Sequence, residues 1–363
     1  MTTIGITGAD GLIGRHLRAA FMAQEGFKVL GAGREAFADQ KRLEKFAGSC
    51  DAIIHLAGKN RGEDAEIAET NVRLVQQLAD ACRKKTGKPP HVFFASSSHI
   101  ALKTAYARSK RRGAEIFRQW ASETGGAFTN LILPHVFGEG GRPFYNSAVA
   151  TFCHQLANGE EPRIIEDKEI ELVHAQDLAP IIQKELGAAS KEVSVGGRKI
   201  SVSGMLSILR ELAASYRAQV IPDLRDEFRL RLFNAYRHCL FPRFYPVALE
   251  LHSDRRGGVF EAVKELSGGQ TFLSTSKPGV VRGNHFHLKK VERFLVVKGK
   301  AVIRVRGLFQ PKAEAFAVDG ESPCFIDMPT LHAHSIENVG TGDLVTLFWA
   351  NEVFDPKNPD TIP

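Results

Sequence analysis

The sequence lacks long apolar runs and paired cysteine motifs. No hydrophobic stretch approaches the roughly 18 residues needed to cross a bilayer. The opening MTTIGITGADG has neither the basic segment nor the apolar core of a signal peptide. The five cysteines are odd in number, scattered and without C-x-x-C spacing. These absences predict a cytoplasmic protein with free thiols and no membrane segment.

Blocks of like charge are also few. The net charge is +7, but lysine and arginine are dispersed, and clusters such as 110–112 and 255–256 are short. We therefore expect no nucleic-acid partner, whereas a modest positive field suits a phosphorylated small substrate. With 43% hydrophobic and 25% charged residues the composition is that of a globular protein, and 363 residues suggest about two domains.

Two kinds of pattern divide the chain. Residues 1–187 alternate short apolar strands with helical segments, which predicts a doubly wound parallel sheet of Rossmann type. A mostly helical stretch follows at 203–240, and the proline-containing run FPRFYP ends it. Beyond this run, β-like segments separated by Gly, Pro and Asp predict an all-β sandwich or barrel. We therefore expect domains at 1–243 and 247–363.

A glycine-rich loop lies between the first expected strand and helix. Gly8, Gly11 and Gly14 are spaced so that the backbone can approach a pyrophosphate at a helix N-terminus. The second strand is followed by Arg34, where an NAD-binding domain usually has an acid for the ribose hydroxyl. Arg34 suits a 2′-phosphate instead, which predicts NADPH as the cofactor; the alternative is an ordinary solvated arginine.

A candidate acid/base follows on a later helix. Tyr106 and Lys110 are four residues apart and share a helix face, so the ammonium can stabilise the phenolate and lower the tyrosine pKa. Ser98, at the end of the preceding strand, is placed to hydrogen-bond the same substrate oxygen. A Tyr–Lys pair at this spacing is equally expected by accident, but the glycine loop before it makes the combination specific.

These motifs resemble those of an extended short-chain dehydrogenase/reductase that modifies nucleotide sugars. The resemblance covers about residues 1–240 and rests on TGADGLIG, HLAG, Ser98 and Y-x-x-x-K. It implies that Tyr106 is the catalytic acid/base, that Lys110 also binds the nicotinamide ribose, and that Ser98, or alternatively Ser97, orients the substrate. The further cofactor-binding residues that it implies are Leu12, Ile13, Leu56 and Ala57.

Metal-ligating side chains recur in the β-rich half. His285 and His287 point to one face of a strand, Glu292 begins the next strand after a turn, and His334 lies on a later one. Three imidazoles and one carboxylate suit a divalent metal, with zinc preferred and nickel, iron or manganese also compatible. Each residue alone is more often an ordinary packed or surface side chain, so the prediction depends on the set.

The spacing of this set resembles the cupin motifs. G(x)5HxH(x)4E(x)6G is complete from Gly279 to Gly299, and the second motif is met at Pro329, His334 and Asn338, with Leu331 in place of a glycine. This resemblance implies a cupin metal-binding domain. His332, two residues before His334, is expected to line the site without binding the metal.

A reductase joined to a cupin resembles the bifunctional capsular-polysaccharide enzymes of the UDP-N-acetyl-L-fucosamine pathway, which form UDP-2-acetamido-2,6-dideoxy-L-talose. The stretch FWANEVFDPKNPDT at 348–361 carries this likeness as well. It implies that the cupin epimerises C3 of a UDP-4-keto-6-deoxy-hexosamine and that the reductase then reduces C4. Lys290 is the preferred acid/base of the cupin step, with Glu352 as the alternative. A homodimer is expected. The competing interpretations are a redox-neutral 4-epimerase or dehydratase, and a cupin that only binds sugar or forms a dimer.

Overall fold

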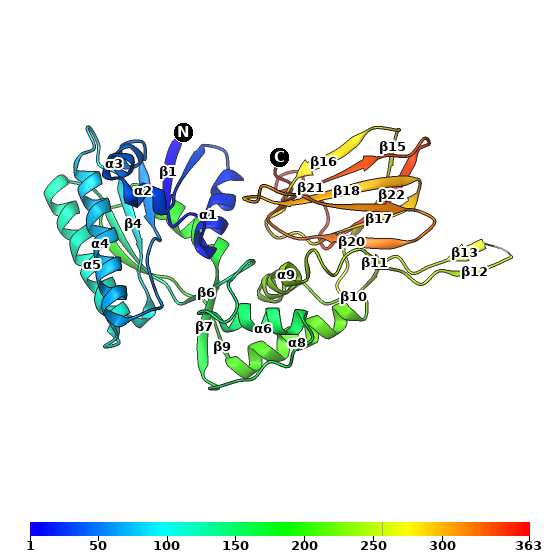
Figure 1. The fold of residues 1–363 in the computed structure, drawn as a ribbon, viewed down its shortest axis with the longest axis horizontal. Helices are drawn as coiled ribbons and strands as arrows, with labels where there is room; N and C mark the ends of the chain where they lie inside the picture. Colours follow the sequence, from blue (N-terminus) through cyan, green and yellow to red (C-terminus); the bar gives the residue numbers. More distant parts are fainter. Residues whose placement is uncertain (256) are drawn as a thin grey trace. The chain divides into compact units, whose positions relative to one another are not determined.

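The computed structural model describes residues 1–255 and 257–363 and separates into two compact units (Figure 1). The first unit comprises residues 1–137 and 169–200, and the second comprises residues 138–168 and 201–363. The second unit thus contains helical segments that precede residue 247 together with the β-rich half. The boundary at 243–247 remains a prediction from the sequence pattern.

The first unit is built on a six-stranded parallel sheet with the order β2-β1-β3-β4-β5-β8. Short apolar strands alternate with amphipathic helices along the chain, as the sequence pattern predicts. The strands are β1 (Thr2–Thr7), β2 (Phe27–Ala32), β3 (Ala52–His55), β4 (His91–Ala95), β5 (Phe128–Ile132) and β8 (Lys191–Ser194). A small sheet contains β6 (His135–Phe137), β7 (Glu169–His174) and β9 (Arg198–Ser201).

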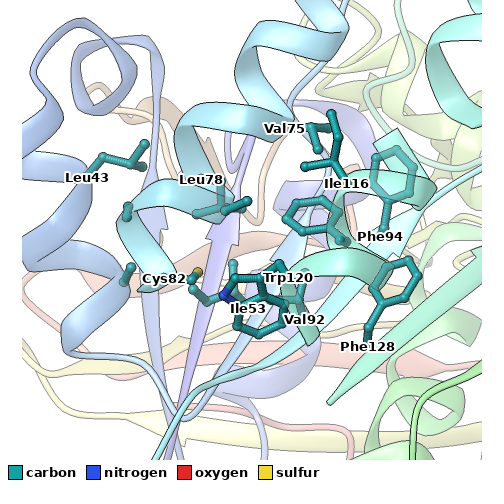
Figure 2. Packing of buried hydrophobic residues seen from close by; sticks show 14 of the residues in the cluster. Leu43, Ile53, Val75, Leu78, Cys82, Val92, Phe94, Ile116, Trp120 and Phe128 are labelled. Carbon is teal, nitrogen blue, oxygen red and sulfur yellow. The ribbon is translucent and has the colours of Figure 1, made fainter. Parts of the chain in front are cut away.

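Helices cover both faces of the parallel sheet. One apolar cluster packs α3, α4 and α5 against one face, and Figure 2 shows Leu78, Trp120 and Phe94 within it. A second cluster packs α1 and α7 against the opposite face. The helices are α1 (Leu12–Met22), α2 (Arg34–Ala38), α3 (Gln40–Gly48), α4 (Asp64–Arg83), α5 (Ala105–Thr124) and α7 (Leu178–Glu185), with the short 3-10 turns η1 (Ser98–Ala101) and η2 (Ala175–Asp177).

The second unit has a β-sandwich with sheet orders β11-β20-β17-β22-β15 and β16-β21-β18-β19. Its apolar core includes Phe294, Phe325 and Ile336 from the two sheets. The strands of these sheets are β11 (Val247–Ala248), β15 (Gln270–Ser276), β16 (Val281–His285), β17 (Glu292–Lys298), β18 (Lys300–Gly307), β19 (Glu314–Asp319), β20 (Cys324–Met328), β21 (His332–Asn338) and β22 (Leu344–Ala350). The predicted fold class, a doubly wound α/β domain followed by an all-β domain, is confirmed.

Helices also belong to the second unit. The remaining elements are α6 (Ala148–Ala157), α8 (Val202–Arg217), α9 (Glu227–Leu240), β10 (Val220–Ile221), β12 (His252–Asp254), β13 (Gly257–Val259) and β14 (Lys264–Glu265). The strands β12 and β13 form a hairpin that projects from the sheets in Figure 1. The strands β10 and β14 form a short parallel pair. Among the described residues, no helix combines the length and apolarity that a membrane crossing requires.

Tyr216 of α8 connects the helices to the sandwich through a buried polar network. Its hydroxyl donates to Asp327 Oδ2 at 2.5 Å and lies 2.6 Å from the hydroxyl of Tyr245. Asp327 also pairs with Arg293 of β17, and Arg237 of α9 donates to the carbonyl of Met328 at 2.8 Å. These bonds satisfy charges that lie entirely inside the unit, so helices and sandwich form one packed structure.

Candidate cofactor and metal sites

The glycine-rich loop connects β1 to α1. Gly8 has φ +66°, and a Cβ there would lie 2.9 Å from the nitrogen of Ala57. A Cβ on Gly14 would lie 2.5 Å from the Gly8 oxygen, so neither position has room for a side chain. Gly11 stands at the N-cap of α1 and provides no side-chain cap. The uncapped N–H groups and the close backbone packing fit a pyrophosphate.

The segment HLAG lies directly beside this loop. The hydroxyl of Thr7 accepts hydrogen bonds from the nitrogens of Leu56 and Ala57 at 3.2 and 3.3 Å, and it lies 2.8 Å from His55 Nδ1. Leu12 and Ile13 begin α1 on the other side of the loop. The structure therefore gathers the predicted backbone contacts of the dinucleotide at the carboxyl end of β1, where ligands of open α/β sheets bind.

Arg34 stands at the first position of α2, after β2. Its side chain is exposed and forms no hydrogen bond or ion pair with any residue that the structure describes. The adjacent carboxylate of Glu35 accepts a hydrogen bond from the nitrogen of Gly33 at 3.1 Å. At the end of β2, Arg34 thus has no partner among the described residues, and the neighbouring Glu35 is bonded to its own loop.

Tyr106 and Lys110 lie on the first turns of α5, which Thr104 caps by accepting from the nitrogen of Ala107 at 3.1 Å. Lys110 Nζ lies 5.5 Å from the centre of the Tyr106 ring and donates to the oxygen of Ala95 at 2.6 Å. Burial lowers the Lys110 pKa to about 8. Burial also raises the Tyr106 pKa, so the expected lowering by Lys110 is wrong for this structure. The reason is that the ammonium is directed at a carbonyl of β4.

The adjacent serines have different local roles. The hydroxyl of Ser97 accepts from the nitrogen of His99 at 3.2 Å and so caps η1. Ser98 is fixed through its backbone, whose nitrogen donates to Leu133 at 2.8 Å, while its side chain is exposed. This difference is compatible with Ser98 as the hydroxyl that faces substrate, and the assignment stays a prediction.

Four predicted metal ligands converge in the second unit. The ligand atoms of His285, His287, Glu292 and His334 all lie within 4.8 Å of one another. A β-bulge at Asn284, which has φ +61°, shifts the register of β16 so that His285 pairs directly with His334. The chain then turns before β17 begins at Glu292. This bulge is the local feature that brings the ligands of two strands together.

Backbone carbonyls set the orientation of two imidazoles. His287 Nδ1 lies 2.5 Å from the oxygen of Asp360, and His334 Nδ1 lies 3.1 Å from that of His332. A carbonyl can only accept, so each Nδ1 carries hydrogen and each Nε2 points toward Glu292. Those Nε2 atoms lie 3.0 and 3.4 Å from Glu292 Oε2. The two Nε2 atoms and Glu292 Oε2 are all acceptors, so a proton or a metal ion must lie between them. The set therefore fits a divalent metal.

The electrostatics of the cluster favour neutral imidazoles at His285 and His334 and an ionised carboxylate at Glu292. Burial, reinforced by the neighbouring histidines, lowers the His285 pKa to about 4, and burial also lowers the His334 pKa. For Glu292, burial favours the protonated form, but the interactions with His287 and His334 outweigh it and lower the pKa. Neutral imidazole and ionised carboxylate are the forms that bind metal.

A cavity of about 410 Å³ opens beside the cluster. Lys290 and Glu352 line it together with His285 and Glu292. Lys290 Nζ donates to the oxygen of Pro359 at 2.7 Å, and Glu352 lies 3.7 Å from the ammonium of Lys289. The two polar side chains considered for proton transfer therefore border the same cavity as two of the four predicted metal ligands, His285 and Glu292.

His332 does not line this cavity, contrary to expectation. Its Nδ1 donates to the oxygen of Thr330 at 2.8 Å, and its ring packs 5.0 Å from the ring of Phe241. It borders a separate, smaller cavity with Phe241 and Gln310. The carbonyl bond and the aromatic contacts hold the ring away from the metal cluster.

Sequence patterns did not identify Asp360 and Thr361, which lie beside the cluster in the structure. Asp360 contacts His287 through its carbonyl, and Thr361 lines the cavity. Both belong to the stretch at 348–361 that carries the family likeness, which was the available signal. Neither has a ligand-like spacing to the histidines, so their role required the fold.

Comparison with known proteins identifies both parts of the chain. Residues 4–196 match the NAD dependent epimerase/dehydratase family. The chain belongs to this family. Residues 252–362 match a polysaccharide biosynthesis C-terminal domain. The combination of reductase and capsule-related domain that the sequence resembles is thereby confirmed.

Two relatives of this epimerase/dehydratase family member match nearly the whole chain, and a third matches part of it. A UDP-2-acetamido-2,6-beta-L-arabino-hexul-4-ose reductase of Pseudomonas aeruginosa is 34% identical over 98% of this chain and 96% of its own. The capsular polysaccharide assembling protein CapF of Staphylococcus aureus is 32% identical over 99% and 98% of the two chains, with a TM-score of 0.64. RMD of P. aeruginosa, solved with NADPH, is 20% identical over 59% of this chain and 84% of its own, with a TM-score of 0.53; it shows the fold alone.

Proposed function

We propose that this chain is a bifunctional nucleotide-sugar enzyme. Its cupin part epimerises C3 of a UDP-4-keto-6-deoxy-N-acetylhexosamine, and its reductase part then reduces the C4 ketone with NADPH to a UDP-6-deoxy-L-talosamine-type product. The enzyme acts in the cytoplasm as a homodimer. The P. aeruginosa relative, whose name states reduction of a 2-acetamido-hexul-4-ose, supports the substrate class.

The four-ligand cluster beside a cavity is the observation that carries the proposal. A cupin that only bound sugar or formed a dimer would not need three imidazoles turned toward one buried carboxylate. Zinc is the preferred metal because it readily accepts mixed nitrogen and oxygen ligands. His285, His287, Glu292 and His334 would hold it.

Bound cofactors supply hydride from NADPH and, from a divalent metal, stabilisation of negative charge on the 4-keto oxygen. In the reductase, hydride addition forms the C4–H bond and moves the carbonyl π electrons to oxygen. Tyr106 then gives its phenolic proton to that oxygen, while Ser98 hydrogen-bonds it and Lys110 holds the ribose. Arg34 is exposed at the position expected for a 2′-phosphate, which supports NADPH over NADH.

Epimerisation needs a proton removed from one face of C3 and returned to the other. Lys290 is our candidate for proton transfer, since its ammonium has three N–H groups and bonds to Pro359 and Thr361 use two of them. Glu352, which lines the same cavity, is the alternative acid/base for this step. Phe272 and Phe348, stacked with ring centres 5.0 Å apart, also line the cavity and offer an aromatic surface for the uracil base.

The decisive experiment separates the two reactions. Purified enzyme is incubated in D2O with a UDP-4-keto-6-deoxy-N-acetylhexosamine, with and without NADPH, and NMR follows deuterium at C3 and the product at C4. We expect C3 exchange without NADPH and a reduced sugar only with it. Tyr106→Phe should abolish NADPH oxidation and leave exchange intact.

Two results would favour the competing interpretations. A change at C4 or C6 of the sugar without consumption of NADPH would indicate a redox-neutral 4-epimerase or dehydratase. Reduction without any deuterium at C3 would leave the cupin as a sugar-binding or dimerising module. Metal analysis of enzyme purified without added metal complements both measurements.

A further inference from the structure

Residues 359–362, which we name the strap, lie beside the cluster of predicted metal ligands in the second unit and contact residues 286–290. The strap is attached through a β-bridge in which Phe286 and Ile362 exchange hydrogen bonds of 2.9 and 3.0 Å between their backbone groups. Phe286 stands between the two predicted ligands His285 and His287. The strap is therefore joined to the chain at the centre of the ligand motif.

Asp360 holds the strap in place through its carboxylate. Oδ1 accepts from the nitrogen of Leu288 at 2.9 Å, and Oδ2 accepts from those of Lys289 and Lys290 at 3.0 and 2.8 Å. Three consecutive N–H groups thus converge on one side chain that is only 9% exposed. Asp360 has φ +40°, a conformation uncommon for a residue with a side chain, and these bonds hold it there.

The same residue contacts a metal ligand through its backbone. The Asp360 carbonyl accepts the Nδ1 hydrogen of His287 at 2.5 Å, which leaves Nε2, turned toward Glu292, as the nitrogen available to a metal. An outer partner of this kind fixes the tautomer and the ring orientation of a ligating histidine. Because the carboxylate anchors the residue, it also determines where this carbonyl lies.

Lys290 is held by the residues on either side of Asp360. Its ammonium donates to the Pro359 oxygen at 2.7 Å and lies 3.4 Å from Thr361 Oγ1, and the hydroxyl of Thr361 donates to the same oxygen at 3.1 Å. The strap therefore contacts a ligand of the cluster and the candidate proton-transfer residue at the same time.

We propose that Asp360 is a positioning residue of the cupin site, through which the strap sets both the metal-binding tautomer of His287 and the direction of the Lys290 ammonium. The inference deepens the proposed function and rests on its metal site. Loss of the Asp360 carboxylate should weaken the metal complex and slow C3 exchange, although Asp360 is neither a ligand nor a proton donor.

The test compares metal binding in the full chain and three variants. Asp360→Ala removes all three contacts to the carboxylate, Asp360→Asn keeps one acceptor oxygen, and Asp355→Asn is a matched control in the preceding loop. Asp355 is exposed, and among the described residues its carboxylate accepts only from the nitrogen of Lys357, at 2.9 Å. Metal-free protein is titrated with Zn²⁺ by calorimetry and with Co²⁺ by its visible absorption spectrum, and bound NADPH fluorescence reports on the first unit.

Outer-sphere partners of metal ligands typically change metal affinity about 10- to 100-fold. We expect a loss of this size in Asp360→Ala, a smaller loss in Asp360→Asn, an altered Co²⁺ spectrum in both, and wild-type behaviour in the control. Wild-type affinity and spectrum in both Asp360 variants would overturn the positioning role while leaving the metal site intact. Absence of metal binding in the wild type would instead overturn the proposed metal site and this inference with it. If Asp360→Ala fails to fold, Asp360→Asn decides.

Discussion

The buried pair of Arg293 and Asp327 provides a sharp test of how the second unit is held together. Arg293 Nε and Nη2 donate to the two carboxylate oxygens at 2.7 and 3.0 Å, and Tyr216 of α8 donates to one of them at 2.5 Å. Arg293 is 1% exposed and Asp327 is 0% exposed. Removing one partner would therefore leave a charge with no access to water.

Asp327→Ala should lower the free energy of unfolding of this unit by about 3–5 kcal/mol, the usual cost of breaking a buried ion pair. The double variant Asp327→Leu/Arg293→Met removes both charges, so it should recover most of that loss. The exposed pair of Arg304 and Glu337, 2.6 Å apart, is a matched control, and Glu337→Ala should cost less than about 1 kcal/mol.

Urea unfolding in a Trp120→Phe background provides the assay. The sequence has two tryptophans, so fluorescence then reports on Trp349 of β22 in the second unit alone. A cost below about 1 kcal/mol for Asp327→Ala would refute the reasoning. So would a double variant as unstable as the single one, since the damage would then come from lost packing and not from the unpaired charge.

Three further predictions concern the first unit. Arg34→Ala should remove most of the preference for NADPH over NADH, measured as the ratio of kcat/KM; equal wild-type values for both cofactors would contradict the assignment. Gly14→Ala should abolish NADPH binding in a fluorescence titration, because its Cβ would lie 2.5 Å from the Gly8 oxygen. Burial lowers the His91 pKa to about 4. As the pH falls from 6.5 to 4, His91 is protonated in the unfolded chain before it is protonated in the folded one. The free energy of unfolding should therefore decrease by about 3 kcal/mol over this range. His91→Gln should flatten this part of the curve of unfolding midpoint against pH, and an unchanged slope would exclude His91.

Much of the first unit follows from local sequence. The strand TTIGIT ends where the glycine loop begins, and β1 spans Thr2–Thr7 in the structure. The spacing of Tyr106 and Lys110 predicts one helix face, and both lie on the first turns of α5. These features depend on residues a few positions apart. The direction of the Lys110 ammonium could not be predicted, because the carbonyl that it contacts belongs to a neighbouring strand.

The cluster of predicted metal ligands was predictable in composition but not in geometry. Side-chain alternation requires a turn between His287 and Glu292, and the structure has one. The bulge at Asn284 and the contact from Asp360 left no periodic signal, since one adds a single residue to a strand and the other joins positions 73 residues apart. Likewise, the packing of α8 onto β20 depends on the Tyr216–Asp327 bond across 111 residues.

Leu331 shows how a departure from a sequence motif can leave the turn unchanged. It occupies the glycine position of the second cupin motif and has φ +60°, which costs a residue with a side chain roughly 1–2 kcal/mol. Its nitrogen donates to His287 at 2.9 Å and its oxygen accepts from Leu308 at 3.0 Å, so the turn is held by backbone bonds on both sides. The side chain is 9% exposed, and its burial offsets a strain of this size. Because the bond to the His287 carbonyl reaches the predicted ligand motif directly, the turn also holds His287 in place without the flexibility of glycine.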